Sequence, residues 1–276
     1  MKMKTILPLL GLLCVGHFLT REASGAEPKR PAPLPVLLVI VNQEFHYQEY
    51  ANARLSLEAA RLPVKVAAAT TARAIPSPNT GQPANTDGGV LPNLPLSSAR
   101  ARDYSAIVFV GGWGSSMYQY AYIDPNFDGV IDNYYANSLY NGDDNLNDGR
   151  AGTNKVVVNQ LINDFIAQDK PVAGICHGIT VLAWARVNGA SPLQGKKVVS
   201  GPMGSPATYF LGTSYADNEL GLHEQVVING GFTNPYSGQA GNPTTTADDV
   251  VVDGRIITAE NYDSAKQLGP VLARQL

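Results

Sequence analysis

The segment that most constrains the fold runs from Ala173 to Ala185 and reads AGICHGITVLAWA. Together with Pro171 and Val172, its first residues are typical of a buried strand, whereas the residues after Gly178 have the apolar spacing of a helix. Cys176 lies between the two, and strand–turn–helix junctions of this kind present nucleophiles in α/β enzymes. We therefore expect the thiol at a helix N-terminus, where unpaired N–H groups favour the thiolate.

His177 follows the cysteine directly in the sequence. An imidazole at that place could accept the thiol proton or add a positive charge beside the sulfur. The alternative is a structural cysteine at a strand end, because free cysteines are among the most buried residues in proteins. Gly174 and Gly178, which flank the Cys-His pair and suit a tight turn, favour the nucleophile.

Apolar runs and helical patterns alternate along the chain. Strands are expected at residues 36–41, 64–69, 104–110, 171–175 and 196–200, and helices at 47–61, 154–170 and 262–275. Residues 249–258 are expected to form a hairpin-like or turn-interrupted strand around Asp253-Gly254. This order predicts an α/β fold with a mostly parallel sheet sandwiched by helices. Sites in such folds lie at the carboxyl ends of strands, where Cys176 and the pair Gly111-Gly112 fall. Glu44 and Glu49 follow the first strand and belong to the same end.

The N-terminal residues 1–26 have the pattern of a signal peptide. Lys2 and Lys4 precede an apolar stretch from Ile6 to Leu19, and small residues at 23–26 suit cleavage. The stretch is too short for a convincing membrane span, so we expect export to the periplasm or the extracellular space, with an uncleaved anchor as the alternative. Residues 27–35 form a proline-rich lead-in, and residues 36–276 form the α/β domain, with polar insertions at about 115–152 and 202–247.

Cleavage would change both the charge and the cysteine count of the chain. It would remove Lys2, Lys4, Arg21 and Glu22, which moves the formal net charge from −3 to −5. A mildly acidic product has no electrostatic basis for binding nucleic acid. Cys14 would be lost as well, so Cys176 would be the only thiol and no internal disulfide could form.

Several segments resemble the ThiJ/PfpI superfamily, the parkinsonism-associated deglycase group with the glutamine amidotransferase-like fold, a relative of the flavodoxin-like architecture. The segments are VLLVIVNQEF with the following Glu49, YSAIVFVGG, AGICHG, QGKKVVS, INGG and VVVDGRIITAEN. The resemblance covers most of residues 36–276. It implies a nucleophilic cysteine, a glutamate from the first strand–helix junction and an oxyanion site of backbone N–H groups, with no cofactor required.

The family roles transfer to particular residues of this chain. The nucleophile is Cys176 and the adjacent base is His177, as in the branch whose elbow reads Cys-His-Gly. The family glutamate corresponds to Glu44 or Glu49, and the distance to the second strand favours Glu49. In that branch the acid that orients the histidine comes from a partner subunit. A homo-oligomer is therefore implied, and the third member of the triad remains unnamed.

The remaining candidates are backbone donors and flanking side chains. The oxyanion donors would be the N–H groups of Gly112, which follows Gly111, and of His177. Their alternative is an ordinary strand-end turn at the two glycines. We expect His46, His223 and Trp113 to be structural or to lie at the pocket rim.

The first insertion contains a partial calcium-loop pattern. The expected ligands are Asp124, Asn126, Asp128 and Asp132, with Gly129 at the bend. Position 12 of the pattern is Tyr135, which lacks the usual bidentate carboxylate. A structural Ca²⁺ and a solvated polar turn therefore both remain open.

Three functions are compatible with these patterns. The first is an exported enzyme whose cysteine attacks small carbonyl or acyl compounds, as the glyoxalase-like, deglycase and hydrolase activities of the family imply. The second is a non-enzymatic oxidation sensor or chaperone-like module in which Cys176 becomes a sulfinic acid. The third is a binding protein that uses a calcium-ordered insertion.

Overall fold

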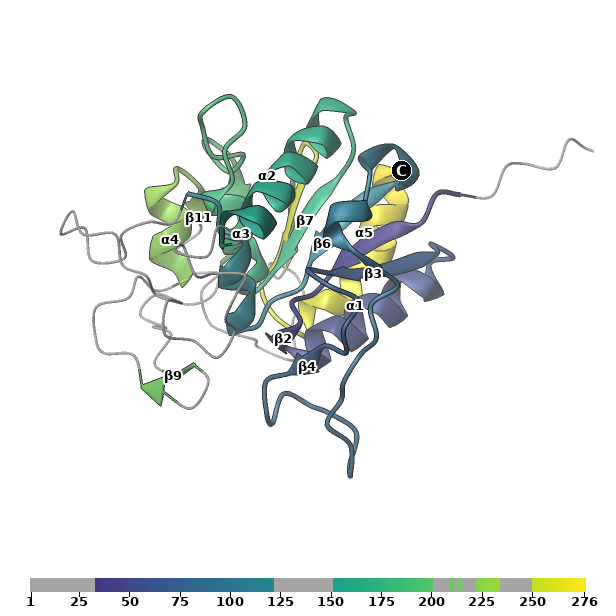
Figure 1. The fold of residues 1–276 in the computed structure, drawn as a ribbon. Helices are drawn as coiled ribbons and strands as arrows, with labels where there is room; N and C mark the ends of the chain where they lie inside the picture. The colour runs from purple at the N-terminus through teal and green to yellow at the C-terminus, as the bar shows by residue number, and fades with distance from the viewer. Residues whose placement is uncertain (1–32, 122–150, 201–208, 211–212, 215–221, 234–249) are drawn as a thin grey trace, which may run out of the picture. The chain divides into compact units, whose positions relative to one another are not determined.

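A central parallel sheet organises the part of the chain that the structure describes. The computed structural model describes residues 33–121, 151–200, 209–210, 213–214, 222–233 and 250–276. In these residues a seven-stranded sheet has the order β12-β13-β7-β6-β1-β3-β5 (Figure 1). The strands are β1 Val36–Val39, β3 Val64–Ala68, β5 Leu94–Pro95, β6 Ala106–Phe109, β7 Val172–Ile175, β12 Val250–Asp253 and β13 Ile256–Ala259. All neighbouring strands are parallel except β12 and β13, which form the expected hairpin-like pair.

The middle strands are apolar along their whole length because both faces of the sheet are covered. Every residue of β1, β6, β7 and β13 is buried. Leu37 pairs with Ile107, and Val108 pairs with Ala173. Continuous apolar strands are typical of parallel sheets between helical layers. The predicted α/β fold with a mostly parallel sheet is confirmed.

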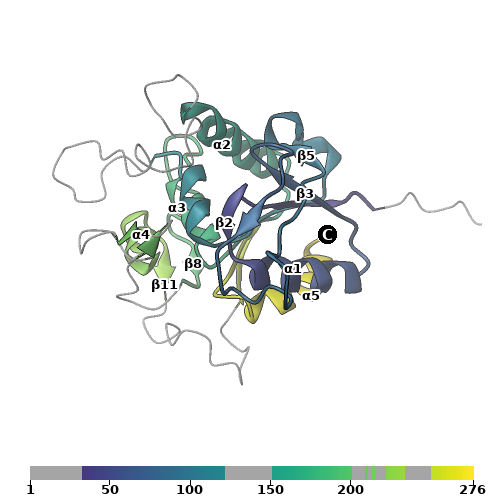
Figure 2. The same cartoon turned by 60° about the horizontal axis from the view of Figure 1, so that its bottom comes forward.

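Helices cover the sheet on both sides. They are α1 Tyr47–Ala59, α2 Ala151–Ala167, α3 Gly178–Trp184 and α5 Leu268–Gln275, which directly follows the 3₁₀ helix η4 Ser264–Gln267. Figures 1 and 2 place α1 and α5 on one face and α2 on the other. Apolar residues at helical spacing bury one stripe of α2, namely Val158, Leu161, Ile162 and Phe165.

The end of the chain is bound closely to α1. The Ser56 hydroxyl donates to the Lys266 carbonyl at 2.5 Å and accepts from the Gly269 N–H at 2.9 Å. One turn earlier in α1, the Asn52 side chain donates to the Tyr262 carbonyl at 2.7 Å. The first helix and the last segment of the chain therefore support each other.

Shorter elements lie around the sheet. They are β2 Gln43–Phe45, β4 Ile75–Pro76, β8 Lys197–Val198, β9 Tyr209–Phe210, β10 Thr213–Ser214, β11 Phe232–Thr233, α4 Leu222–Ile228 and the 3₁₀ helices η1 Leu96–Ser98, η2 Ala101–Asp103 and η3 Trp113–Tyr118. The strand expected at 196–200 is only the two residues of β8. It pairs with β11 and not with the main sheet.

The boundaries of the polar insertions differ in part from the sequence expectation. Residues 115–118, expected as the start of a loop insertion, belong to η3, where Ser115, Ser116, Met117 and Tyr118 are buried. The second insertion contains α4 and β11. The signal-peptide residues 1–26 and the calcium-loop residues 124–135 lie outside the described residues. In the described part of the chain, no helix is both long and apolar enough to cross a membrane.

Candidate active site

A strained turn places the cysteine at the carboxyl end of the central strand. β7 ends at Ile175, α3 begins at Gly178, and Cys176 between them has φ = +50°. Residues other than glycine rarely adopt this left-handed backbone conformation, so the surrounding structure must hold Cys176 in it. The Cys176 N–H donates to the Ala259 carbonyl at 2.8 Å and supplies part of that support. The predicted strand–turn–helix junction is confirmed.

Glycines allow the turn to pack against the neighbouring strand. A Cβ atom on Gly178 would lie 2.3 Å from the Phe109 carbonyl oxygen, at the end of β6. On Gly174 it would lie 2.9 Å from the Gly178 carbonyl oxygen. Both contacts are with backbone atoms, which cannot move aside cheaply. Small residues before and after the Cys-His pair are therefore a steric requirement of this junction.

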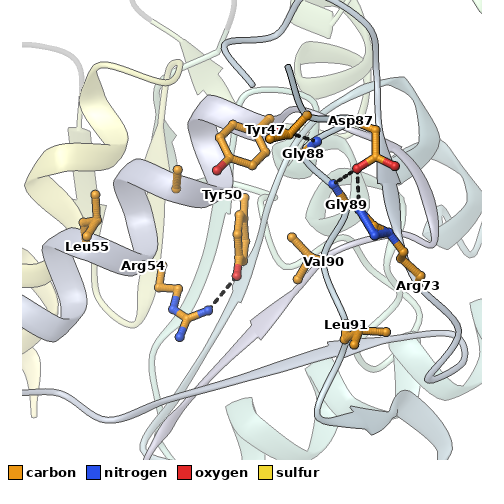
Figure 3. Close-up of a pocket in the computed structure, with 12 residues that line it drawn as sticks. Tyr47, Tyr50, Arg54, Leu55, Arg73, Asp87, Gly88, Gly89, Val90 and Leu91 are labelled. Carbon is orange, nitrogen blue, oxygen red and sulfur yellow. Dashed lines mark hydrogen bonds and ion pairs between the residues drawn. The ribbon is translucent and has the colours of Figure 1, made fainter. Parts of the chain in front are cut away.

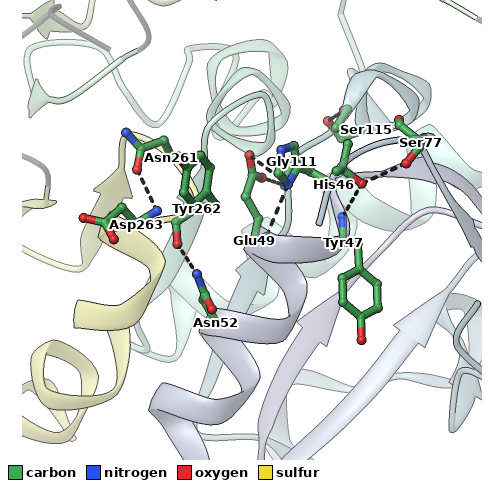
Figure 4. Close-up of polar contacts among 12 residues, drawn as sticks. His46, Tyr47, Glu49, Asn52, Ser77, Gly111, Ser115, Asn261, Tyr262 and Asp263 are labelled. Carbon is green, nitrogen blue, oxygen red and sulfur yellow. Dashed lines mark hydrogen bonds and ion pairs between the residues drawn. The ribbon is translucent and has the colours of Figure 1, made fainter. Parts of the chain in front are cut away.

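Glu49 is the acid that the fold brings to the thiol. It lies in the first turn of α1 with only 1% of its surface exposed, forms a hydrogen bond with Cys176 and accepts the Gly111 N–H at 2.9 Å. Figure 4 shows its carboxyl group directed at Gly111. Glu44 lies in β2 with φ = +57°. Of the two predicted acids, the structure therefore pairs Glu49 with the cysteine.

Burial controls the ionisation of this pair. Burial raises the pKa of Glu49 to about 8, although its hydrogen bonds with Cys176 and with Gly111 lower the pKa in part. Glu49 therefore keeps its proton at neutral pH. Burial also raises the pKa of the Cys176 thiol, and the charge of an ionised Glu49 would raise it further. The sequence prediction of a thiolate favoured by the helix N-terminus is thus wrong in direction, because burial outweighs the His177 N–H that donates to the sulfur.

The two predicted oxyanion glycines have different surroundings. The Gly111 N–H is occupied by Glu49. Gly112 has φ = +103°, and a Cβ atom there would lie 2.3 Å from the Glu44 carbonyl oxygen and 2.4 Å from the His46 nitrogen. This backbone conformation and this close approach both require glycine. Gly112 is also the N-cap of η3, which carries the next part of the site.

His177 is held by residues of η3. Its Nε2 lies 2.6 Å from the Ser116 hydroxyl, and the Trp113 ring meets the imidazole edge-on at 5.0 Å. Only 4% of the histidine is exposed, and burial lowers its pKa to about 4. The imidazole is therefore neutral at physiological pH. No hydrogen bond joins it to Glu49 or to another acid among the described residues.

The other two histidines that the structure describes have structural contacts. His46 caps α1 by accepting the Glu49 N–H at 3.4 Å, and its ring stacks on Tyr262 (Figure 4). His223, on α4, has its Nδ1 3.0 Å from the hydroxyl of Ser200, which follows β8. Trp113, expected to be structural or to lie at the pocket rim, contacts His177 directly.

Two residues of the site were missed in the sequence. Ser116 lies in the run WGSSMY, which has the composition of a loop and shows no helical or strand pattern. Glu260 is 2% exposed, and its charge is among the influences that raise the pKa of Cys176. It comes directly after β13, so its place at a strand's carboxyl end could have identified it.

A separate hollow is lined by α1 and by the segment 86–91. It has a volume of about 620 Å³, and Tyr47, Tyr50, Arg54, Arg73 and Asp87 are among its lining residues (Figure 3). Arg54 is already paired with Glu58 and with the Tyr50 hydroxyl, and Arg73 with Asp87. Cys176 does not line this hollow, so we assign the chemistry to the strand ends instead.

Metal ligation is not visible in the described residues. No group of three or more histidine, cysteine, aspartate or glutamate residues among them could hold a metal ion. Asp124, Asn126, Asp128 and Asp132 lie outside these residues, so the calcium site stays a prediction.

Comparison with known proteins identifies the fold. No family model and no curated protein matches the sequence. Solved structures do match. The ThiJ/PfpI domain protein from Brachyspira murdochii has a TM-score of 0.54 at 18% identity, over 88% of this chain and 96% of that one. The chain has the ThiJ/PfpI fold.

Two further structures with the ThiJ/PfpI fold are comparably similar. The Rapid Encystment Protein 24 KDa of Francisella tularensis has a TM-score of 0.60 at 16% identity, over 87% of this chain and 98% of that one. Drosophila melanogaster DJ-1beta has a TM-score of 0.52 at 19% identity, over 88% and 90%. At these identities the likeness concerns the fold, and the roles of individual residues need their own argument.

Stability should depend on pH through the buried groups of this site. Burial lowers the pKa of both His46 and His177 to about 4 and raises that of Glu49 to about 8. The histidines stabilise the folded state fully above pH 6.5 and lose this contribution as the pH falls to 4. Glu49 stabilises it fully below pH 4.5 and loses this contribution as the pH rises to 8.

Together the three groups give a maximum in stability near pH 6.5. We expect the free energy of unfolding to fall by about 1 kcal/mol by pH 8 and about 2 kcal/mol by pH 4.5, because the histidine and glutamate contributions partly cancel. Urea unfolding at the three pH values measures both slopes. Glu49→Gln should remove the alkaline decline and keep the acid one. An unchanged alkaline decline in that variant would assign it to another group.

Proposed function

We propose that the chain is a cysteine-dependent hydrolase or lyase that acts on small carbonyl or acyl compounds. The observation that carries this proposal is the Cys176 sulfur, held at a strained strand–helix junction and hydrogen-bonded to the buried Glu49 carboxyl. A structural cysteine would need neither the left-handed backbone nor a buried acid beside it. Strain and buried ionisable groups both concentrate at functional sites.

The reaction begins with addition of the sulfur to a carbonyl carbon. The Cys176 Sγ–C bond forms, the π electrons of the carbonyl move to its oxygen, and the thiol proton ends on that oxygen. Glu49, protonated at neutral pH, positions the thiol and relays this proton. In an acyl substrate, the proton on the adduct's oxygen passes to the leaving group as the adduct collapses and the leaving group departs. Water then hydrolyses the resulting thioester, which releases the carboxylic acid and returns a proton to the sulfur.

Backbone and side-chain donors stabilise the oxygen during addition. The Gly112 and His177 N–H groups are the proposed oxyanion donors, and the His177 N–H would turn from the sulfur, to which it donates in the free site, to the new oxyanion. Each such donor typically contributes about 3 to 4 kcal/mol to lowering the barrier. The His177 imidazole assists in its neutral form because burial keeps its pKa low. It therefore moves protons or donates a hydrogen bond, and it does not form an ion pair with a thiolate.

The cellular setting is part of the proposal. The signal-peptide pattern of residues 1–26 supports export to the periplasm or the extracellular space. In the mature chain Cys176 would then be the only thiol, so a thiol reagent would modify one atom. The resemblance to the Cys-His-Gly branch supports a homo-oligomer.

Titrating this single thiol tests the proposal. A mature protein beginning near residue 27 is assayed with methylglyoxal and with a small ester, and iodoacetamide is added in steps. We expect turnover to fall in proportion to the alkylated fraction of Cys176 measured by mass spectrometry, and substrate to slow the alkylation. Because the pKa of Cys176 is raised, alkylation should accelerate toward alkaline pH.

Full turnover by completely alkylated protein would refute the cysteine mechanism. Absence of turnover, combined with a mass gain of two oxygens on Cys176 under mild peroxide, would instead favour the oxidation sensor.

A further inference from the structure

His177 has a partner from its own chain at one ring nitrogen. The Ser116 hydroxyl lies 2.6 Å from Nε2, and both residues are more than nine-tenths buried. At this distance the contact is a short hydrogen bond. The other ring nitrogen, Nδ1, is buried and has no hydrogen-bond partner among the described residues.

A second bridge, from Gln119 directly after η3, fixes the same residue through its backbone. The Gln119 side chain donates to the Thr180 hydroxyl at 2.5 Å, and that hydroxyl donates to the His177 carbonyl at 2.7 Å. Gln119 and Thr180 are both buried, with at most 1% of their surface exposed. η3 and Gln119 therefore hold the histidine at its ring and at its carbonyl, and both contacts are within one chain.

The two tautomers of His177 leave different groups unpaired. If Nε2–H donates to Ser116, the Nδ1 lone pair and the serine proton both lack a partner among the described residues. If the serine hydroxyl donates to Nε2, only the Nδ1–H lacks one. Each buried polar group without a partner is costly, so the second arrangement is favoured.

We propose that Ser116 is a positioning residue that holds His177 in the Nδ1-protonated tautomer, so that Nδ1–H is the donor offered to a substrate carbonyl oxygen. The proposal rests on the proposed function for the identity of the substrate class. It also replaces the orienting acid expected from a partner subunit with a serine of the same chain. The hydrogen bond from the Ser116 hydroxyl to Nε2 fixes the tautomer, as the group that orients the imidazole does in other histidine-dependent sites.

The tautomer can be measured without turnover. In protein labelled with ¹⁵N at histidine, the resonances of His177 are assigned by their disappearance in His177→Gln. At pH 6.5 to 7.5 we expect Nδ1 to be protonated and Nε2 to be unprotonated. In Ser116→Ala this preference should be lost, whereas Ser116→Thr, which keeps the hydroxyl, should retain it.

Ser115→Ala is the matched control for the spectrum. Its hydroxyl donates to the Gly112 carbonyl at 2.7 Å, and no hydrogen bond joins it to His177 in the described structure. The His177 tautomer should therefore be unchanged in this variant. Protonation at Nε2 in the wild type, or an unchanged spectrum in Ser116→Ala, would overturn the proposal.

Kinetics give a second readout when the enzyme turns over. Ser116→Ala should lower kcat by roughly 10-fold to 100-fold with little change in KM. This fall is smaller than the one expected when an oxyanion donor is removed altogether, because the imidazole is still present. Ser116→Thr should restore most of kcat, which general loss of packing would not allow. If the tautomer follows Ser116 but no substrate is turned over, the positioning role stands and the proposed function fails.

Discussion

Turnover of a small carbonyl or acyl substrate should fall at least about 1,000-fold in kcat/KM when Cys176 is replaced by serine. An alcohol is a far weaker acid than a thiol, so serine needs a strong base. The site offers none at neutral pH: Glu49 holds its proton because burial raises its pKa to about 8, and burial lowers the pKa of His177 to about 4. Steady-state kinetics over a range of substrate concentrations gives the ratio.

Ser105→Ala is the matched control for this variant. Ser105 directly precedes β6, at the end of the sheet opposite Cys176. Its hydroxyl makes only a long contact of 3.4 Å, with the Pro35 carbonyl oxygen. Its turnover should equal that of the wild type. Turnover within tenfold of the wild type in Cys176→Ser, with unchanged urea unfolding, would exclude the sulfur as the nucleophile.

Gly178→Ala should lower the free energy of unfolding by about 3 kcal/mol. The added methyl carbon would lie 2.3 Å from the Phe109 carbonyl oxygen and 2.9 Å from its carbon. To relieve this overlap, α3 must move away from β6, and α3 packs against β7 as well. Urea unfolding at pH 6.5 measures the loss.

Gly89→Ala provides the comparison, because neither glycine has a positive φ. The three atoms nearest to a methyl group at residue 89 all belong to the guanidinium end of Arg73, which is half exposed and can rotate away. We expect a loss below about 1 kcal/mol there. Equal losses in the two variants would show that the close approach of α3 to β6 is not what constrains residue 178.

Regular periodicity made most of the fold predictable from the sequence. Continuous apolar runs identified β1, β6 and β7, and the buried stripe of α2 has ordinary helical spacing. The short strand β8 was placed correctly but not its partner, because a two-residue pairing leaves no periodic signal.

The candidate site was predictable where a local motif defined it. The glycines around Cys176 indicated the turn, and the distance to the second strand favoured Glu49 over Glu44. The raised pKa of the thiol was not predictable, because it depends on burial by segments distant in sequence. Ser116 was missed since η3 is too short and too polar to show a pattern, and its burial comes from tertiary contacts.

The hydrogen bonds between α1 and the end of the chain have a consequence for biosynthesis. Glu49 lies on α1, and α1 is held through Ser56 and Asn52 by residues after Asn261. A nascent or truncated chain that lacks these last residues would contain the cysteine but not the support for its acid. The pairing of the thiol with its acid therefore depends in part on the last residues of the chain to be synthesised.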